Sequence, residues 1–226
     1  AMESRGLGDV YKRQFNNSFI TGAGNDTNDD AFEFGIDNTG DHLTGTVEII
    51  NSTVQNFFNK GLRIRNNGSG SANVTVSGST FANSSEGQAL LLQANGSSSF
   101  TVNVNNSSDF SNLRDTHYFA NAIGAASSIT STINGNTFRD GPLVAGVIVG
   151  NGGLINSDNG THQFHAHSNT YDAIAIGFVV ANNADGEIQG RFGHATVAAN
   201  GNDIINPRRS DGLSIAAEGA SGSGNI

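Results

Sequence analysis

The chain has 226 residues, including 30 Gly, 2 Pro and no Cys, and 14% of its residues are charged. So few charged residues exclude a protein built on long surface helices, which need Lys, Glu and Arg on their solvent-facing side. The absence of Cys excludes disulfides, zinc–thiolate sites and thiol catalysis, and a formal charge of −9 without a basic stripe argues against a nucleic-acid partner.

Residues 1–14 differ in character from the rest of the chain. They carry Arg5, Lys12 and Arg13, and they lack the Asn/Ser/Gly alternation that follows. They look like translated adaptor or non-coding sequence and have no apolar core of a signal peptide. We therefore expect residues 1–14 to be a non-native or disordered segment. Residues 15–226 are expected to form a single domain that is a fragment of a larger protein.

From residue 15 onward, one pattern recurs about every thirty residues. A small polar pair precedes an apolar anchor, and the anchors are Phe19, Val54, Phe81, Phe110, Phe138, Tyr171 and Ile204. The residue two before each anchor is Asn or Ser, and the residue directly before it is Ser, Thr or Asp. The residue two after it is Asn, Asp or Thr, except for Ala173. Three columns in register indicate a structural repeat.

Alternating apolar runs accompany the anchors, such as Val74 and Val76 before the polar pair and residues 90–92 after the anchor. Period-two alternation between turns rich in Gly and Asn predicts short strands. A sandwich of hairpins would not keep one long period with registered polar columns, whereas a coil would. The longest apolar runs, such as residues 143–149, are too short to span a membrane.

The repeat therefore predicts an all-β fold, a right-handed parallel β-helix, or solenoid, of about seven coils. In such a coil, equivalent residues stack at about 4.8 Å. Asn side chains are then expected to form hydrogen-bonded ladders, and the anchors an aromatic file in the interior.

The stretch Ile-Asn-Gly-Asn-Thr-Phe-Arg-Asp-Gly at residues 133–141 shows the repeat in its clearest form. In this pattern, residues 15–226 resemble the right-handed parallel β-helix repeat proteins of the pectate-lyase-like superfamily. That superfamily includes pectate lyases and the passenger segments of bacterial autotransporters and other adhesins. The resemblance implies the fold, but its members include lyases, hydrolases, epimerases and proteins without catalysis. Function must therefore come from a site.

An acidic segment at residues 25–30 is the densest charge cluster of the chain. Carboxylates this close repel one another unless a cation neutralises them, and Ca²⁺ prefers oxygen ligands. Residues 22–27 also resemble half of the nonapeptide Ca²⁺ repeat of secreted β-rolls. The sequence predicts Asp26, Asp29 and Asp30 as metal ligands for Ca²⁺, the one candidate cofactor; a solvated turn is the alternative.

No catalytic constellation is complete in the sequence. Asp29-Asp30 and Arg63-Ile64-Arg65 resemble two motifs of the pectin-cleaving hydrolases, but the Asn-Thr-Asp and Gly-His-Gly motifs are absent. Arg63 and Arg65 are expected to point outward from the same face of one strand. One of them could act as the base of a lyase; alternatively, both are outward charges opposed by Glu33 of the preceding coil. We therefore assign no catalytic or cofactor-binding residue.

His165 and His167 are expected to point outward from one strand, leaving Phe164 and Ala166 for the interior. Two outward imidazoles can chelate Zn²⁺ or Ni²⁺, but no nearby carboxylate supplies a third ligand. We therefore expect these histidines to be surface residues.

Short turns on nearly every coil leave little material to wall a cleft. We expect a non-catalytic structural or adhesive segment of a secreted or cell-surface bacterial protein. Its expected partners are a host or environmental surface or glycan and the adjoining coils of a longer chain, without a membrane span. The alternative is a polysaccharide lyase or hydrolase, or a glycan-binding β-helix, whose groove would lie at the longer coils between Phe138 and Ile204.

Overall fold

The computed structural model describes residues 2–4, 10–23, 29–36, 43–141, 143–144, 147–148, 151–193, 201–205 and 213–217. Every regular element among these residues is a β-strand. The described residues contain no helix that is long and apolar enough to cross a membrane.

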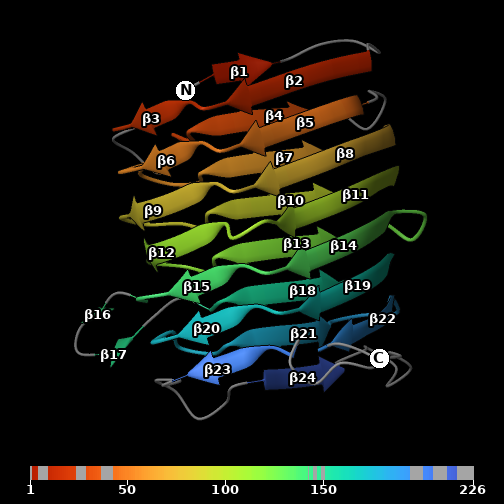
Figure 1. Ribbon diagram of the computed structural model, residues 1–226. Helices are drawn as coiled ribbons and strands as arrows, with labels where there is room; N and C mark the ends of the chain where they lie inside the picture. Colours follow the sequence, from red (N-terminus) through yellow and green to blue (C-terminus); the bar gives the residue numbers. More distant parts are fainter. Residues whose placement is uncertain are drawn as a thin grey trace.

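Three parallel sheets, here called A, B and C, surround one core (Figure 1). Sheet A contains β1 (Met2–Ser4), β4 (Phe32–Ile36), β7 (Leu62–Asn66), β10 (Leu90–Ala94), β13 (Tyr118–Ala122), β18 (Gly153–Ser157), β21 (Phe178–Asn182) and β24 (Leu213–Ala217). Sheet B contains β2 (Val10–Asn16), β5 (Thr44–Ile50), β8 (Ser69–Ser77), β11 (Ser97–Asn105), β14 (Ser128–Asn134), β19 (Thr161–His167) and β22 (Glu187–Phe192). Sheet C contains β3 (Phe19–Thr21), β6 (Thr53–Gln55), β9 (Thr80–Ser84), β12 (Asp109–Leu113), β15 (Thr137–Arg139), β20 (Thr170–Asp172) and β23 (Asp203–Ile205).

The chain visits the three sheets in turn, as in β4, β5 and β6, before β7 pairs in parallel with β4 and starts the next coil. The predicted parallel β-helix is therefore confirmed. Sheets B and C each contain seven strands. A short antiparallel hairpin, β16 (Leu143–Val144) with β17 (Val147–Ile148), interrupts the coil between sheets C and A.

The prediction of Phe19 as the first anchor is wrong, because the anchor of this coil is Ile20. Ile20, not Phe19, lies opposite Val54 in sheet C, and the side chain of Phe19 is 65% exposed. Phe19 directly follows the small polar pair Asn17-Ser18 and matches the later aromatic anchors, so the repeat alone selects the wrong residue. The strand register places Phe19 on the outer face and Ile20 in the column of anchors.

An aromatic file fills the interior, as predicted. Phe81, Phe110, Phe138 and Tyr171 are fully buried and stack in register through sheet C. Their ring centroids are 5.6, 4.9 and 5.0 Å apart, with interplanar angles of 12°, 8° and 7°. Burial of each ring contributes roughly 1.5–3 kcal/mol, so the file is a major source of stability.

A polar ladder runs beside this file, two residues before each anchor. From Ser52 to Asn202, each side-chain oxygen of the ladder accepts a hydrogen bond from the backbone N–H of the equivalent residue one coil earlier, at 3.0–3.2 Å. Its members are Ser18, Ser52, Ser79, Ser108, Asn136, Asn169 and Asn202. The ladder satisfies backbone groups at the turn from sheet B to sheet C, where they would otherwise be buried without a partner.

The residues two after the anchors explain the Asn column of the sequence. Gly22, Asn56, Asn83, Asn112, Asp140 and Ala173 all have φ between 51° and 66°, in the left-handed region. Asn, Asp and Gly tolerate this conformation better than other residues do. The column therefore marks a sharp left-handed bend at the end of each sheet C strand.

The structure also includes part of the N-terminal segment that sequence reasoning left out of the fold. β2 begins at Val10 and pairs in parallel with β5, and β1 pairs with β4. These strands extend sheets B and A by one coil. The origin of residues 1–14 as adaptor sequence is not addressed by this pairing and stays a prediction.

Candidate functional site

The outer face of sheet B is covered by polar side chains in straight columns. Because strand residues alternate between core and solvent, every second residue of each strand faces outward, and parallel pairing places these residues one above another. One column contains Thr46, Asn73, Thr101, Thr130, Gln163 and Gln189. The next contains Glu48, Thr75, Asn103, Thr132, His165 and Arg191.

The middle of this face is uncharged. The four consecutive strands β8, β11, β14 and β19 contain no Asp, Glu, Lys or Arg. Charged residues return only in the outer strands of sheet B, for example Glu48 in β5 and Arg191 in β22. Hydroxyl and amide groups therefore dominate a flat surface four coils high.

Several of these outward polar side chains take no part in holding the fold together. Within the described part of the chain, the side chains of Thr75, Thr101, Asn103 and Gln163 make no hydrogen bond or ion pair. The polar residues of the interior ladder, in contrast, are almost all bonded between coils. The donors and acceptors of the outer face are thus available to an external partner.

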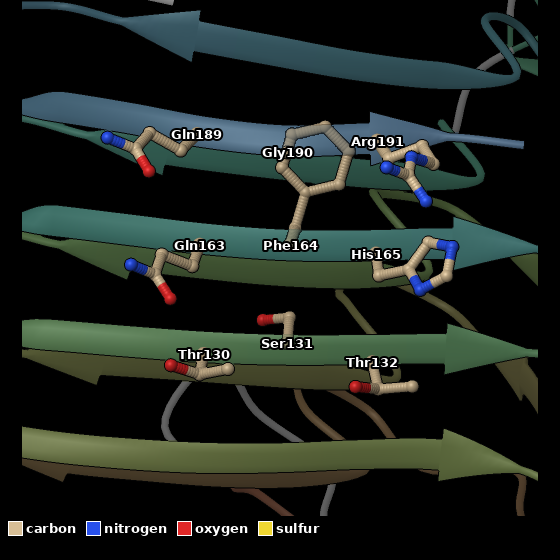
Figure 2. A pocket seen from close by; sticks show the side chains of 9 residues that line it. All are labelled: Thr130, Ser131, Thr132, Gln163, Phe164, His165, Gln189, Gly190 and Arg191. Carbon is tan, nitrogen blue, oxygen red and sulfur yellow. The ribbon is translucent and has the colours of Figure 1, made fainter. Parts of the chain in front are cut away.

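A shallow trough of about 410 Å³ crosses β14, β19 and β22 on this face (Figure 2). One wall is formed by Thr130, Gln163 and Gln189, and the other by Thr132, His165 and Arg191. Ser131, Phe164 and Gly190 form the middle row between the walls. Strands β19 and β22 of the trough lie in the longer coils between Phe138 and Ile204, where a groove was expected, whereas β14 lies before Phe138. Strand side chains rather than inserted loops build the walls.

One wall of the trough ends in a corner formed by His165 and Arg191. His165 and Arg191 are direct neighbours in the register of β19 and β22. Nε2 of His165 lies 3.2 Å from the carbonyl oxygen of Gly193, which can only accept, so Nε2 donates. His165 and His167 lie on the same outward face, as expected, with ring centroids 4.5 Å apart.

The predicted Ca²⁺ ligands are only partly described. Asp26 lies outside the described residues, and Asp29 and Asp30 precede β4. Asp30 is 1% exposed; its Oδ1 accepts a hydrogen bond from the Lys60 backbone N–H at 3.0 Å, and its Oδ2 lies 3.5 Å from Nη1 of Arg63. The described residues contain no group of three or more His, Cys, Asp or Glu arranged to hold a metal. The Ca²⁺ site therefore stays a prediction.

Asp30 and Lys60 are neighbouring ionisable residues whose pKa values are both shifted by burial. Burial raises the pKa of Asp30, although Arg63 opposes the rise. Burial also lowers the pKa of Lys60, and the nearby carboxylates of Asp115 and Asp30 limit the fall. Nη1 of Arg63 lies 3.4 Å from Oε1 of Glu33 in the preceding coil, which confirms the expected pairing of Arg63 with Glu33.

A serine–histidine pair lies in the core, and sequence reasoning missed it. Ser131 Oγ lies 2.9 Å from Nε2 of His162 and 2.7 Å from the hydroxyl of Tyr118, and Nδ1 of His162 lies 3.2 Å from the carbonyl oxygen of Asn156. A nucleophile must reach its substrate, but Ser131 is 1% exposed and His162 is fully buried. The pair is therefore a structural network. Its signal in the sequence is a polar residue at an inward position of two successive strands.

Comparisons with known proteins add no assignment: no family model, no curated protein and no solved structure matches this chain. Function therefore has to be inferred from the geometry of the sheet B face.

Proposed function

We propose that this chain is a non-catalytic adhesive β-helix whose sheet B outer face binds a neutral, hydroxyl-rich surface such as a glycan. The observation that carries this proposal is the uncharged polar outer face of β8, β11, β14 and β19, on which Thr75, Thr101, Asn103 and Gln163 make no hydrogen bond or ion pair within the described part of the chain. Ser, Thr, Asn and Gln can each donate and accept, as sugar hydroxyls do.

The regularity of the face supports binding by many weak contacts. Neighbouring columns are about 6.7 Å apart along a strand, and neighbouring rows about 4.8 Å apart across the coils. A single hydrogen bond contributes only about 0.5–1.5 kcal/mol, so affinity would have to come from several made at once. A β-helix holds the donors and acceptors in place before binding, which reduces the entropic cost of association.

The distribution of reactive groups supports a non-catalytic role. Ser131 and His162 are buried in the core, and Asp30 is engaged by Arg63 and by the backbone of Lys60. General acid–base catalysis requires such groups to reach the substrate. The accessible groups of sheet B are mostly hydroxyls and amides, which suit recognition better than chemistry.

The biological setting is part of the same proposal. A Cys-free, repeat-built β-helix with short turns suits a rigid segment of a secreted or cell-surface bacterial protein, of the kind found in autotransporter and adhesin passengers. Its partners would be a host or environmental glycan and the adjoining coils of a longer chain.

The proposal is tested by glycan-array binding of the wild type and of Thr75→Val/Thr101→Val. This double variant keeps side-chain shape but removes two outward hydroxyls of sheet B. We expect binding to weaken roughly 5- to 100-fold from the loss of about two hydrogen bonds. The matched control Thr80→Val, on the outer face of sheet C, should bind as the wild type does. Equal binding by all three proteins would reject sheet B as the adhesive face.

A polysaccharide lyase or hydrolase is the second candidate, because burial raises the pKa of Asp30 and lowers that of Lys60, the directions that a general acid and a general base need. This candidate requires Asp30, which is 1% exposed in the structure, to become accessible to a substrate. Cleavage of polygalacturonate by the purified protein, lost in Asp30→Ala, would favour this candidate over adhesion.

A further inference from the structure

We propose that the trough across β14, β19 and β22 is a subsite for a sugar unit that carries an oxyanion, a carboxylate or a sulfate, beside a hydroxyl. The inference rests on the proposed adhesive function, and it adds a ligand class that the neutral part of the face does not select. Arg191 would bind the oxyanion, and His165 would bind the neighbouring hydroxyl.

Arg191 is available for this role. Its side chain is exposed, and within the described part of the chain it makes no hydrogen bond or ion pair. Two other exposed arginines of the described residues differ from it: Arg114 pairs with Glu86, and Arg139 pairs with Asp109 and Asp140. A guanidinium presents two parallel N–H donors to a carboxylate or a sulfate.

His165 is positioned for the hydroxyl. Its Nε2 donates to the carbonyl oxygen of Gly193, which fixes the ring orientation; in the tautomer with its proton on Nε2, Nδ1 is an acceptor. Because His165 and Arg191 are register neighbours at a strand spacing of about 4.8 Å, one sugar unit can contact both.

The opposite wall supplies neutral contacts. Thr130 and Gln163 are exposed and project from the next column, as Figure 2 shows. Gln189 donates its amide N–H to Glu187, which leaves its carbonyl oxygen as an acceptor. A sugar chain lying along the trough would therefore meet hydroxyl and amide groups on one side and the His165–Arg191 corner on the other.

Because the whole chain is negatively charged, an anionic sugar is expected to be attracted only close to Arg191. With a formal charge of −9, the protein repels polyanions in general. At physiological salt the Debye length is about 8 Å, so the exposed Arg191 can act at short range while distant carboxylates are screened. Glu187, the nearest carboxylate of β22, is engaged with Gln189.

The test compares dextran, carboxymethyl-dextran and dextran sulfate of equal chain length, immobilised for biolayer interferometry at 150 mM salt. These polymers share one backbone, so their differences report the oxyanion, and the two charged arms separate carboxylate from sulfate. We expect at least one charged polymer to bind roughly 10- to 100-fold more tightly than dextran. Arg191→Gln should abolish this preference, and Arg191→Lys should restore it in part.

Arg114→Gln is the matched control, because it removes the same charge outside the trough. If Arg114→Gln reduces the preference as much as Arg191→Gln does, or if the wild type binds all three polymers equally, the inference is wrong while the adhesive function stands. If the charged polymers bind through Arg191 and dextran does not bind, the inference stands and the neutral adhesive function fails. Absence of binding to every polymer would contradict both.

Discussion

At the residue scale, Ala173 occupies a backbone conformation that suits Asn, Asp or Gly. Its φ is 51°, and it follows Tyr171 in the column otherwise filled by Gly, Asn and Asp. The left-handed region costs a residue with a Cβ roughly 1–2 kcal/mol. We expect Ala173→Gly to raise the free energy of unfolding by about 1 kcal/mol, as measured by urea denaturation. Ala181→Gly, within β21, should lower it by about 0.5–1 kcal/mol; equal effects of the two changes would contradict the account.

Tyr118 and Tyr171, both fully buried, should respond oppositely to the loss of their hydroxyls. The Tyr171 hydroxyl is buried without a hydrogen-bond partner among the described residues, whereas the Tyr118 hydroxyl lies 2.7 Å from Ser131 Oγ. A buried unpaired polar group costs about 1–3 kcal/mol. Tyr171→Phe should therefore stabilise the protein and Tyr118→Phe should destabilise it, each by about 1 kcal/mol in thermal unfolding. Destabilisation by Tyr171→Phe would show that its hydroxyl has a partner.

Two buried histidines should make the fold sensitive to acid. Burial lowers the pKa of His117 to about 3 and of His162 to about 4. In the unfolded chain the pKa of histidine is about 6.5, so the unfolded state binds more protons below that pH. The stability contribution is complete above about pH 6.5 and decreases as the pH falls, with a slope of up to about 1.4 kcal/mol per pH unit for each histidine.

The pH dependence is measured by urea denaturation between pH 6.5 and 5.0, a window above the titration of most carboxylates. His117→Phe keeps an aromatic ring against Phe138, which lies 6.3 Å from the His117 ring, and removes one titrating group. The pH dependence of the free energy of unfolding should therefore become weaker, by up to about 1.4 kcal/mol per pH unit, the contribution of one histidine. An unchanged slope would mean that His117 is protonated in the folded protein.

At the element scale, the polar ladder joins the strands into coils. Asn169 accepts hydrogen bonds from the backbone and side-chain nitrogens of Asn136, and it donates to the carbonyl oxygen of Ile133 and to Asn202. Asn169→Ala would leave several of these buried groups unpaired and should cost about 2–4 kcal/mol. Asn103→Ala, which removes an outer-face amide without a partner among the described residues, should cost less than about 0.5 kcal/mol. Chemical denaturation measures the free energy of unfolding of both variants, and equal losses would contradict a structural role of the ladder.

The elements were predictable from the sequence where repeat columns carried the information. The anchors from Val54 to Tyr171 and the residues before them could be placed because each column contains one kind of side chain. The first coil could not, because Phe19 and Ile20 are both apolar after a polar pair and only the pairing of β3 with β6 separates them.

The candidate site was less predictable than the fold. The outward positions Thr101 and Asn103 follow from strand alternation alone. The trough depends on how β14, β19 and β22 align across coils of unequal length, and no repeat column fixes that register. The same alignment places Ser131 beside His162 in the core, a contact invisible in a linear reading of the chain.

At the scale of the whole molecule, the parts that stabilise the fold are separate from the proposed binding face. The aromatic file lies on the inner side of sheet C, and the polar ladder lies in the turn from sheet B to sheet C. The outer face of sheet B carries polar side chains that make no hydrogen bond or ion pair within the described residues, such as Thr101 and Asn103. Seven strands at about 4.8 Å extend this face to roughly 30 Å, long enough to follow an extended polymer. An adhesive role requires that this face, and no other, makes the contact.

Blocking one face at a time tests this requirement most directly. The chain has no Cys, so Asn103→Cys on the outer face of sheet B and Ser111→Cys on that of sheet C, in the same coil, can each be labelled with a bulky polyethylene-glycol maleimide. Glycan binding of the labelled proteins is then compared with that of the unlabelled ones. The account predicts loss of binding after labelling Asn103→Cys and retention after labelling Ser111→Cys; retained binding with sheet B blocked would contradict it.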